Sequence, residues 1–129
     1  MGALKPKGRA RNARYAGIPH IVMESENYSK LSGWDVKLLL ELAKQYNGGN
    51  NGDLSAAWST MRQQGWRSPG TLNTSIKRLL QFGFIVQSRQ GGRHKCSLYA
   101  LTWRPIDECK GKLEIATTTQ ASNEWKVSA

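Results

Sequence analysis

The most regular apolar pattern in the chain spans residues 68–82 and predicts a helix with one buried side. Its apolar positions recur at helical spacing and are Leu72, Ile76, Leu79 and Leu80. Ser68 is a good N-cap, Pro69 suits the first helical position, and Gly83 predicts the end. The other side carries short polar and basic residues, namely Gly70, Asn73, Thr74, Lys77, Arg78 and Gln81. We treat this helix as the element that organises the chain.

A β-hairpin is predicted directly after this helix. Residues 84–86 have strand character, residues 90–92 form a Gly-rich turn, and residues 95–103 return as the second strand. The tip of this hairpin is basic, with Arg89, Arg93, His94 and Lys95. A helix with a polar and basic face, followed by a basic hairpin, suits a nucleic-acid duplex better than a catalytic pocket.

Three further helical segments are predicted before residue 65. A short helix begins near Pro19 and is followed by an irregular link to residue 31. Ser32 and Asp35 form a capping box for a helix that ends at the Gly/Asn-rich turn of residues 47–52. Its predicted buried stripe is Val36, Leu39, Leu40 and Ala43, and its predicted water-facing residues are Lys37, Glu41, Lys44 and Gln45.

The next helix is predicted over residues 56–64, after a brief strand contact at Leu54 and with Ser55 as its cap. Trp58 and Met61 face inward. Gly65 ends this helix, and the four-residue link 65–68 joins it to the capped helix that follows, as a helix-turn-helix requires. We expect Trp66 to pack under this turn.

The charge is segregated along the chain. The formal net charge is +10, yet residues 54–106 contain no acidic residue. The basic residues of that span are Arg62, Arg67, Lys77, Arg78, Arg89, Arg93, Lys95 and Arg104. Residues 1–14 hold five more basic residues without an acid. This distribution indicates a polyanionic partner.

Several classes of function are disfavoured by composition. Cys96 and Cys109 are too few for a disulfide framework and are expected to be free thiols, with Cys96 in a strand. His20 has no partner at metal-ligand spacing, so we expect no metal and no cofactor. The absence of acids between Asp53 and Asp107 removes a catalytic carboxylate pair, and we expect no enzyme activity. No apolar run is long enough for a membrane span, and we expect a cytoplasmic protein without a membrane or small-molecule partner.

These patterns divide the chain into a basic flexible arm (residues 1–14), a folded domain (15–106) and a loose polar tail (107–129). The arm is either unstructured or follows the DNA backbone or minor groove. Trp125 in the tail either pins the tail to the body or lies in solvent. Leu31, Val22 and Trp125 could serve a dimer contact, so a homodimer stays open.

The segment from Trp34 to Trp103 resembles a winged helix-turn-helix domain. Residues 28–33 (YSKLSG), 37–40 (KLLL), 46–48 (YNG), 51–52 (NG) and 79–85 (LLQFGFI) are similar to winged-helix proteins of phages and integrative elements, including replication-initiator-like proteins. The resemblance implies an α+β fold with a three-helix core and a β-hairpin wing. It also implies a transcriptional regulator or replication-initiation factor that binds double-stranded DNA.

The expected interface joins the helix 68–82 to the turn and the wing. Ser68 and the N-terminal amides of the helix suit a phosphate. Asn73 suits adenine, and Lys77 or Arg78 suits guanine or a phosphate. The full set of expected DNA-binding residues is Arg62, Arg67, Ser68, Gly70, Thr71, Asn73, Thr74, Lys77, Arg78, Arg89, Arg93, His94 and Lys95. The alternative is a winged-helix docking module that binds another protein without reading DNA.

Overall fold

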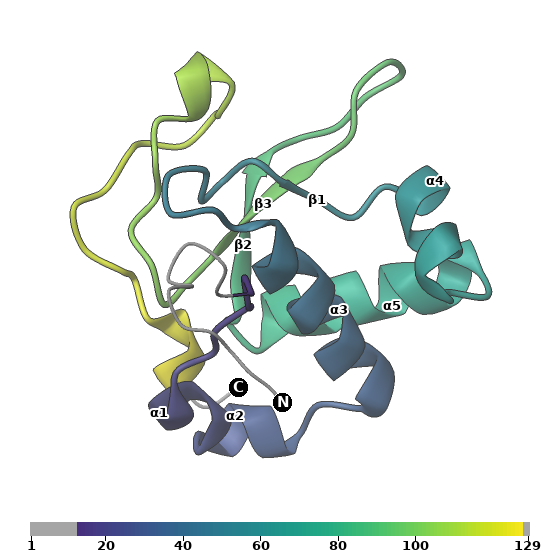
Figure 1. Cartoon of the computed structure of the whole chain (residues 1–129), viewed down its shortest axis with the longest axis horizontal. Helices are drawn as coiled ribbons and strands as arrows, with labels where there is room; N and C mark the ends of the chain where they lie inside the picture. Colours follow the sequence, from purple (N-terminus) through teal and green to yellow (C-terminus); the bar gives the residue numbers. More distant parts are fainter. Residues whose placement is uncertain (1–12, 128–129) are drawn as a thin grey trace.

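A three-stranded antiparallel sheet and a layer of helices share one apolar core in the computed structural model, which describes residues 13–127. The elements are, in order, α1 (His20–Met23), α2 (Glu26–Ser29), α3 (Gly33–Gln45), β1 (Leu54–Ser55), α4 (Trp58–Met61), the 3-10 turn η2 (Arg62–Gln64), α5 (Pro69–Gln81), β2 (Ile85–Arg89), β3 (Leu98–Leu101), and the 3-10 turns η3 (Cys109–Gly111) and η4 (Glu124–Lys126). The strand order is β1-β3-β2. Helices α3 and α5 cross below the sheet, and the β2–β3 hairpin projects away from them (Figure 1). The predicted α+β class is confirmed.

Helix α3 begins at the predicted capping box. The Ser32 hydroxyl accepts from the Asp35 N–H at 3.2 Å, and the Asp35 carboxylate accepts from the Ser32 N–H at 2.9 Å. The predicted buried stripe was partly wrong, because Leu40 is 46% exposed. Asp35 itself faces the core, and this polar residue shifts the buried stripe by one position. The buried residues of α3 are Asp35, Leu38, Leu39, Leu42 and Ala43, while Val36 is half-buried.

Gln45 was predicted to face water but instead joins α3 to the sheet. Its side-chain amide donates to the Ser55 carbonyl and accepts from the Ser55 N–H, both at 2.8 Å. These two bonds satisfy the backbone of β1 as a neighbouring strand would. Leu54 makes the predicted strand contact, pairing with Tyr99 of β3.

The shorter helices differ from prediction at their ends. Helix α1 begins directly after Pro19, as expected, but residues 26–29 form a second helix where an irregular link was predicted. Ser25 caps that helix by accepting from the Tyr28 N–H. Helix α4 begins two residues later than predicted, because the Ser55 hydroxyl bonds the Ala57 N–H before the helix starts.

The hairpin turn lies further along the chain than predicted. Gly92 pairs with Lys95, which places Arg93 and His94 at the tip. Gly91 lies in the ascending arm, where an added Cβ would stand 2.5 Å from the Ser97 nitrogen, so glycine is required. Strand β3 is shorter than predicted, and Cys96 is an exposed loop residue instead of a strand residue.

The segment after residue 106 is not the loose tail that the sequence indicated. Trp125 is 5% exposed and belongs to the core. The Asn27 side-chain amide donates to the carbonyls of Phe82, Trp125 and Val127 at 3.0, 3.1 and 2.6 Å. A side chain at Gly83 would collide with the Glu124 carbonyl. The end of α5, helix α2 and turn η4 are therefore one packed unit.

This packing also removes two of the suggested dimer contacts. Val22 and Trp125 are buried within the chain's own core, and Leu31 is half-buried against it. Most of the predicted basic arm, residues 1–12, lies outside the described residues. Over residues 13–127 no helix combines the length and the apolar character needed to cross a bilayer. The same residues contain no cluster of His, Cys, Asp and Glu that could hold a metal ion.

Candidate nucleic-acid interface

Helix α5 presents one polar side to solvent. Its bounds match the predicted helix, and Leu72, Ser75 and Leu79 are buried against α3 and the sheet, with Ile76 and Leu80 half-buried. The exposed residues of α5 repeat at intervals of three or four positions and are Pro69, Gly70, Asn73, Thr74, Lys77 and Gln81. Such spacing places them on one strip along the helix. The strip combines amide, hydroxyl and ammonium groups, which can donate and accept hydrogen bonds at a base edge.

The start of α5 is already capped from within the chain. The Ser68 hydroxyl accepts from the Thr71 N–H at 3.1 Å and lies 3.0 Å from the Thr71 hydroxyl. Pro69 has no N–H to offer. The cap therefore uses the Ser68 hydroxyl and the Thr71 N–H, which we expected to bind a phosphate. Beside this cap, Gly70 is exposed and Thr71 is half-buried.

The turn before α5 is fixed by two tryptophans. Trp66 is 3% exposed and its ring lies 4.8 Å from that of Trp34, which confirms that it packs under the turn. Gly65 has φ +94°, a left-handed conformation that favours glycine. With Trp66 buried, the flanking Arg62 and Arg67 are both exposed. The turn thus presents two guanidinium groups next to the N-terminus of α5.

The tip of the β2–β3 hairpin places three further polar groups in solvent. Arg93, His94 and Lys95 are all exposed, and the backbone bond from the Gly92 N–H to the Lys95 carbonyl at 2.9 Å closes the tip without using their side chains. Arg89 behaves differently from the prediction. It is half-buried, and its guanidinium donates to the Cys96 carbonyl across the hairpin at 2.8 Å, so it braces the two arms.

Arg78 has a structural role that the sequence did not indicate. Its Nε donates to Asp35 Oδ2 and another guanidinium nitrogen donates to the Lys30 carbonyl, both at 2.7 Å, and the guanidinium lies over the Phe82 ring. Arg78 therefore points from α5 toward α3, away from the exposed strip. We withdraw it from the expected base-contacting residues.

The Asp35 carboxylate is kept ionised by these contacts. Burial by itself raises the pKa of Asp35, but hydrogen bonds from Arg78, from the Ser32 N–H and from the hydroxyls of Ser75 and Ser32 lower it. The net effect is a pKa below the usual value for aspartate. Since the partner carboxylate is 1% exposed, the bond to Arg78 is part of the contact between α3 and α5.

A shallow groove of about 180 Å³ separates α5 from the base of the β2–β3 hairpin. Asn73 and Ile76 line it from the helix, and Ser97 and Tyr99 line it from β3 and the residues before it. The Tyr99 phenol can donate or accept a hydrogen bond, and its burial raises the pKa of that phenol above its usual value. Sequence reasoning missed Tyr99 and Ser97, because only the fold brings them beside Asn73.

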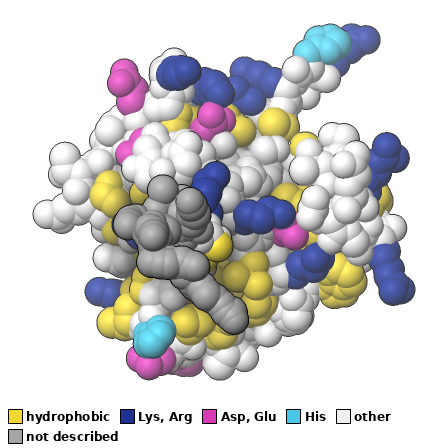
Figure 2. Space-filling view, viewed as in Figure 1, with side chains coloured by type: hydrophobic (Ala, Val, Ile, Leu, Met, Phe, Trp, Pro, Cys, Tyr) yellow, Lys and Arg dark blue, Asp and Glu magenta, His cyan; other side chains and the backbone are white. Residues whose placement is uncertain are grey.

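The basic groups of the turn and of the hairpin tip belong to residues 54–106, which contain no acidic residue. Figure 2 shows Lys and Arg side chains with a histidine at the wing tip, and further basic side chains along the edge beside α4. Glu114 contacts the hairpin, and its carboxylate accepts from the Gln90 N–H at 3.0 Å. This bond lies at the base of the hairpin arm, below the bridge between Gly92 and Lys95. The tip therefore keeps its positive charge.

Comparison of the chain with protein-family models, curated proteins and solved structures gives no match.

Proposed function

We propose that this protein binds double-stranded DNA as a winged helix-turn-helix domain. In this proposal α3, α4 and α5 form the helical core, α5 is the recognition helix, and the β2–β3 hairpin is the wing. One observation carries the proposal: the exposed strip of α5 is continuous with a basic turn on one side and a basic wing on the other. The charge of these three parts suits the phosphates that line a groove.

The proposed base contacts come from the exposed strip. The Asn73 amide can pair bidentately with adenine, and Lys77 can reach guanine or a phosphate. Gly70 and Thr74 add little bulk, which allows the helix to approach the floor of the major groove. Because Arg78 is held by Asp35, the reading of bases falls to the residues on the strip.

The proposed backbone contacts flank the helix. Arg62 and Arg67 bind phosphates on one side of the groove, and Arg93, His94 and Lys95 bind phosphates or enter the minor groove on the other. A transcriptional regulator or a replication-initiation factor of a phage or mobile element would use both kinds of contact, base-specific and sequence-independent. Both roles remain proposals, as do a cytoplasmic location and a homodimer on a palindromic site.

The test is a titration of fluorescently labelled random duplex with the full chain. DNA binding predicts an affinity that falls steeply with salt. Lys77→Ala should make the slope of log affinity against log salt less negative by about 0.9. Lys110→Ala is the matched control, since Lys110 is an exposed cation in the turn η3. No binding at low salt would reject the proposal and favour a protein-docking module.

A second measurement tests the recognition strip itself. Selection of bound sequences from a random library gives a preferred site, and Asn73→Ala should reduce discrimination at one position of that site by about 1–3 kcal/mol. A library that shows no enrichment would leave the backbone contacts but remove α5 as a reader of bases.

A further inference from the structure

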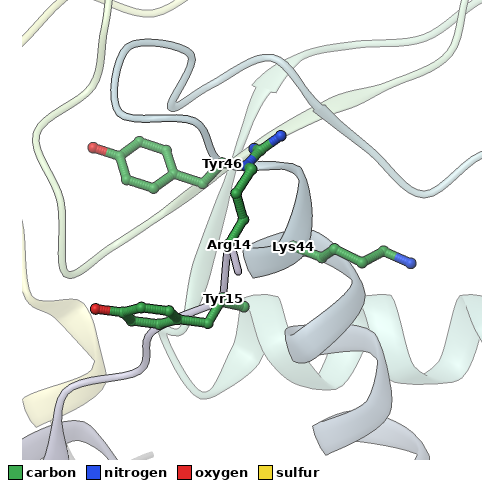
Figure 3. Close-up of a pocket in the computed structure, with 5 residues that line it drawn as sticks. Arg14, Tyr15, Lys44 and Tyr46 are labelled. Carbon is green, nitrogen blue, oxygen red and sulfur yellow. The ribbon is translucent and has the colours of Figure 1, made fainter. Parts of the chain in front are cut away.

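A second basic surface, with exposed aromatic rings, lies at the C-terminal end of α3. The extended residues 14–17 run past this helix end and enclose two adjoining hollows of about 240 and about 340 Å³. Arg14, Tyr15 and Tyr46 line both hollows. In Figure 3 the rings of Tyr15 and Tyr46 extend to the same side, with the Arg14 side chain rising between their backbones and Lys44 extending to the other side.

The two rings offer flat apolar faces at the surface. Tyr15 is 91% exposed, so nearly all of its ring is in contact with solvent. Tyr46 caps the end of α3, and the Arg104 guanidinium lies 5.3 Å from the centre of its ring, a cation–π distance. Leaving a tyrosine ring in water forgoes the stability gained by burying it, and an exposed ring beside cations is the arrangement that stacks on nucleobases.

The charge of the hollows is positive. Arg14, Lys44 and Arg104 line them, and no carboxylate does among the residues that the structure describes. Glu41 contacts Lys44 at 3.0 Å from outside the hollows, but it is shared with Lys37 at 3.7 Å. The C-terminal end of a helix, here that of α3, carries about half a negative charge. Three full positive charges outweigh that half charge and the shared carboxylate.

We propose that these hollows bind a nucleotide unit, with its base stacked on Tyr15 and its phosphate held by Arg14 and Arg104. The unit belongs either to a single-stranded nucleic acid or to a free nucleotide, which present the same chemistry. This site goes beyond the proposed duplex binding, because its residues come from residues 14–15, α3 and the segment after β3. None of them lies on α5 or on the wing.

The experiment measures the affinity of a short fluorescent oligodeoxythymidylate for the full chain. All proteins carry Arg93→Ala and Lys95→Ala, which weakens binding of the strand to the wing. Tyr15→Ala should weaken binding between about 5-fold and about 150-fold, the range for loss of one stacked base. Tyr15→Trp should preserve it, and the introduced tryptophan should be quenched by the bound strand.

Charge is tested with a matched pair of variants. Arg104→Gln should weaken binding, whereas Lys110→Gln, which removes one exposed cation elsewhere, should leave it unchanged. Thymidine monophosphate as competitor distinguishes the sources: displacement at an affinity close to that of the strand identifies a free-nucleotide site, and failure to displace identifies a strand site. Equal affinity of Tyr15→Ala and its parent, or no binding of either ligand, overturns the proposal.

Duplex titrations in parallel, with the wing intact, separate this proposal from the previous one. Tyr15→Ala should leave duplex affinity within about twofold of the parent, and Lys77→Ala should leave oligodeoxythymidylate affinity within the same range. A chain that fails to bind duplex but binds the strand through Tyr15 rejects the recognition-helix proposal alone. The opposite result rejects the nucleotide site alone.

Discussion

Replacing both basic side chains of the wing tip should change how DNA affinity depends on salt. In the double variant Arg93→Ala with Lys95→Ala, the backbone bridge between Gly92 and Lys95 does not need either side chain, and both residues are exposed. The fold is therefore expected to be unchanged. A loss of affinity in this variant reports on contacts with DNA instead of on stability.

The magnitude follows from the exposed cations of the proposed interface, which are Arg62, Arg67, Lys77, Arg93 and Lys95. If each neutralises one phosphate, log affinity falls with log salt with a slope of about −4.5 in the parent and about −2.7 in the variant. A rise from about 50 to about 200 mM salt then weakens the parent roughly 500-fold and the variant roughly 40-fold.

The assay is fluorescence anisotropy of a labelled duplex at four or more salt concentrations within that range. Lys110→Ala is the control, because it removes an exposed cation from the turn η3, outside the proposed interface. Its line should run parallel to that of the parent. A wing variant whose line is also parallel to the parent would show that the wing does not touch DNA.

The remaining predictions concern stability. Arg78→Ala should lower the free energy of unfolding, measured in urea, by about 3 kcal/mol. This value is the low end of the range for breaking a buried ion pair, because the Arg78 side chain is 35% exposed. An unchanged urea midpoint would contradict a stabilising role of this ion pair. The contribution of Asp35 to the free energy of unfolding should be complete above about pH 4 and should be lost as the pH drops further, because the pKa of Asp35 is lowered on folding. Asp35→Asn should therefore make the fall in stability with decreasing pH shallower, and identical pH profiles of the two proteins would refute this. Trp125→Ala should cost about 3–5 kcal/mol, measured by thermal or urea unfolding, whereas a solvated Trp125 would cost almost nothing.

Local signals were the reliable part of the sequence. The cap and proline that start α5, the capping box of α3 and the buried Trp66 all depend on residues close together in the chain. The ends of α3 and α5 and the approximate position of the hairpin followed from them. The same local patterns predicted which face of α5 is polar, and the proposed base contacts come from that face.

The errors came from polar residues that the fold buries. A hydrophobic pattern assigns Asp35 to the surface, so the α3 stripe was placed one position away and Arg78 was left without its partner. Asn51 was taken as part of a turn, yet its side chain is fully buried and its amide donates to the carbonyls of Leu101, Arg104 and Pro105. Their burial is compensated by groups far away in the chain, such as Arg78 for Asp35 and the carbonyl of Leu101 for Asn51, and a single sequence gives no sign of these pairs.

The hydrogen bonds from the Asn27 side-chain amide to Phe82, Trp125 and Val127 determine which part of the core can form last. They connect a helix formed early in synthesis to the end of α5 and to a tryptophan about a hundred positions downstream. Before residues 124–127 have left the ribosome, the Trp125 and Val127 carbonyls cannot accept from Asn27, and the Glu124 carbonyl cannot pack against Gly83. The core, to which Trp125 belongs, can therefore close completely only after that residue has been synthesised.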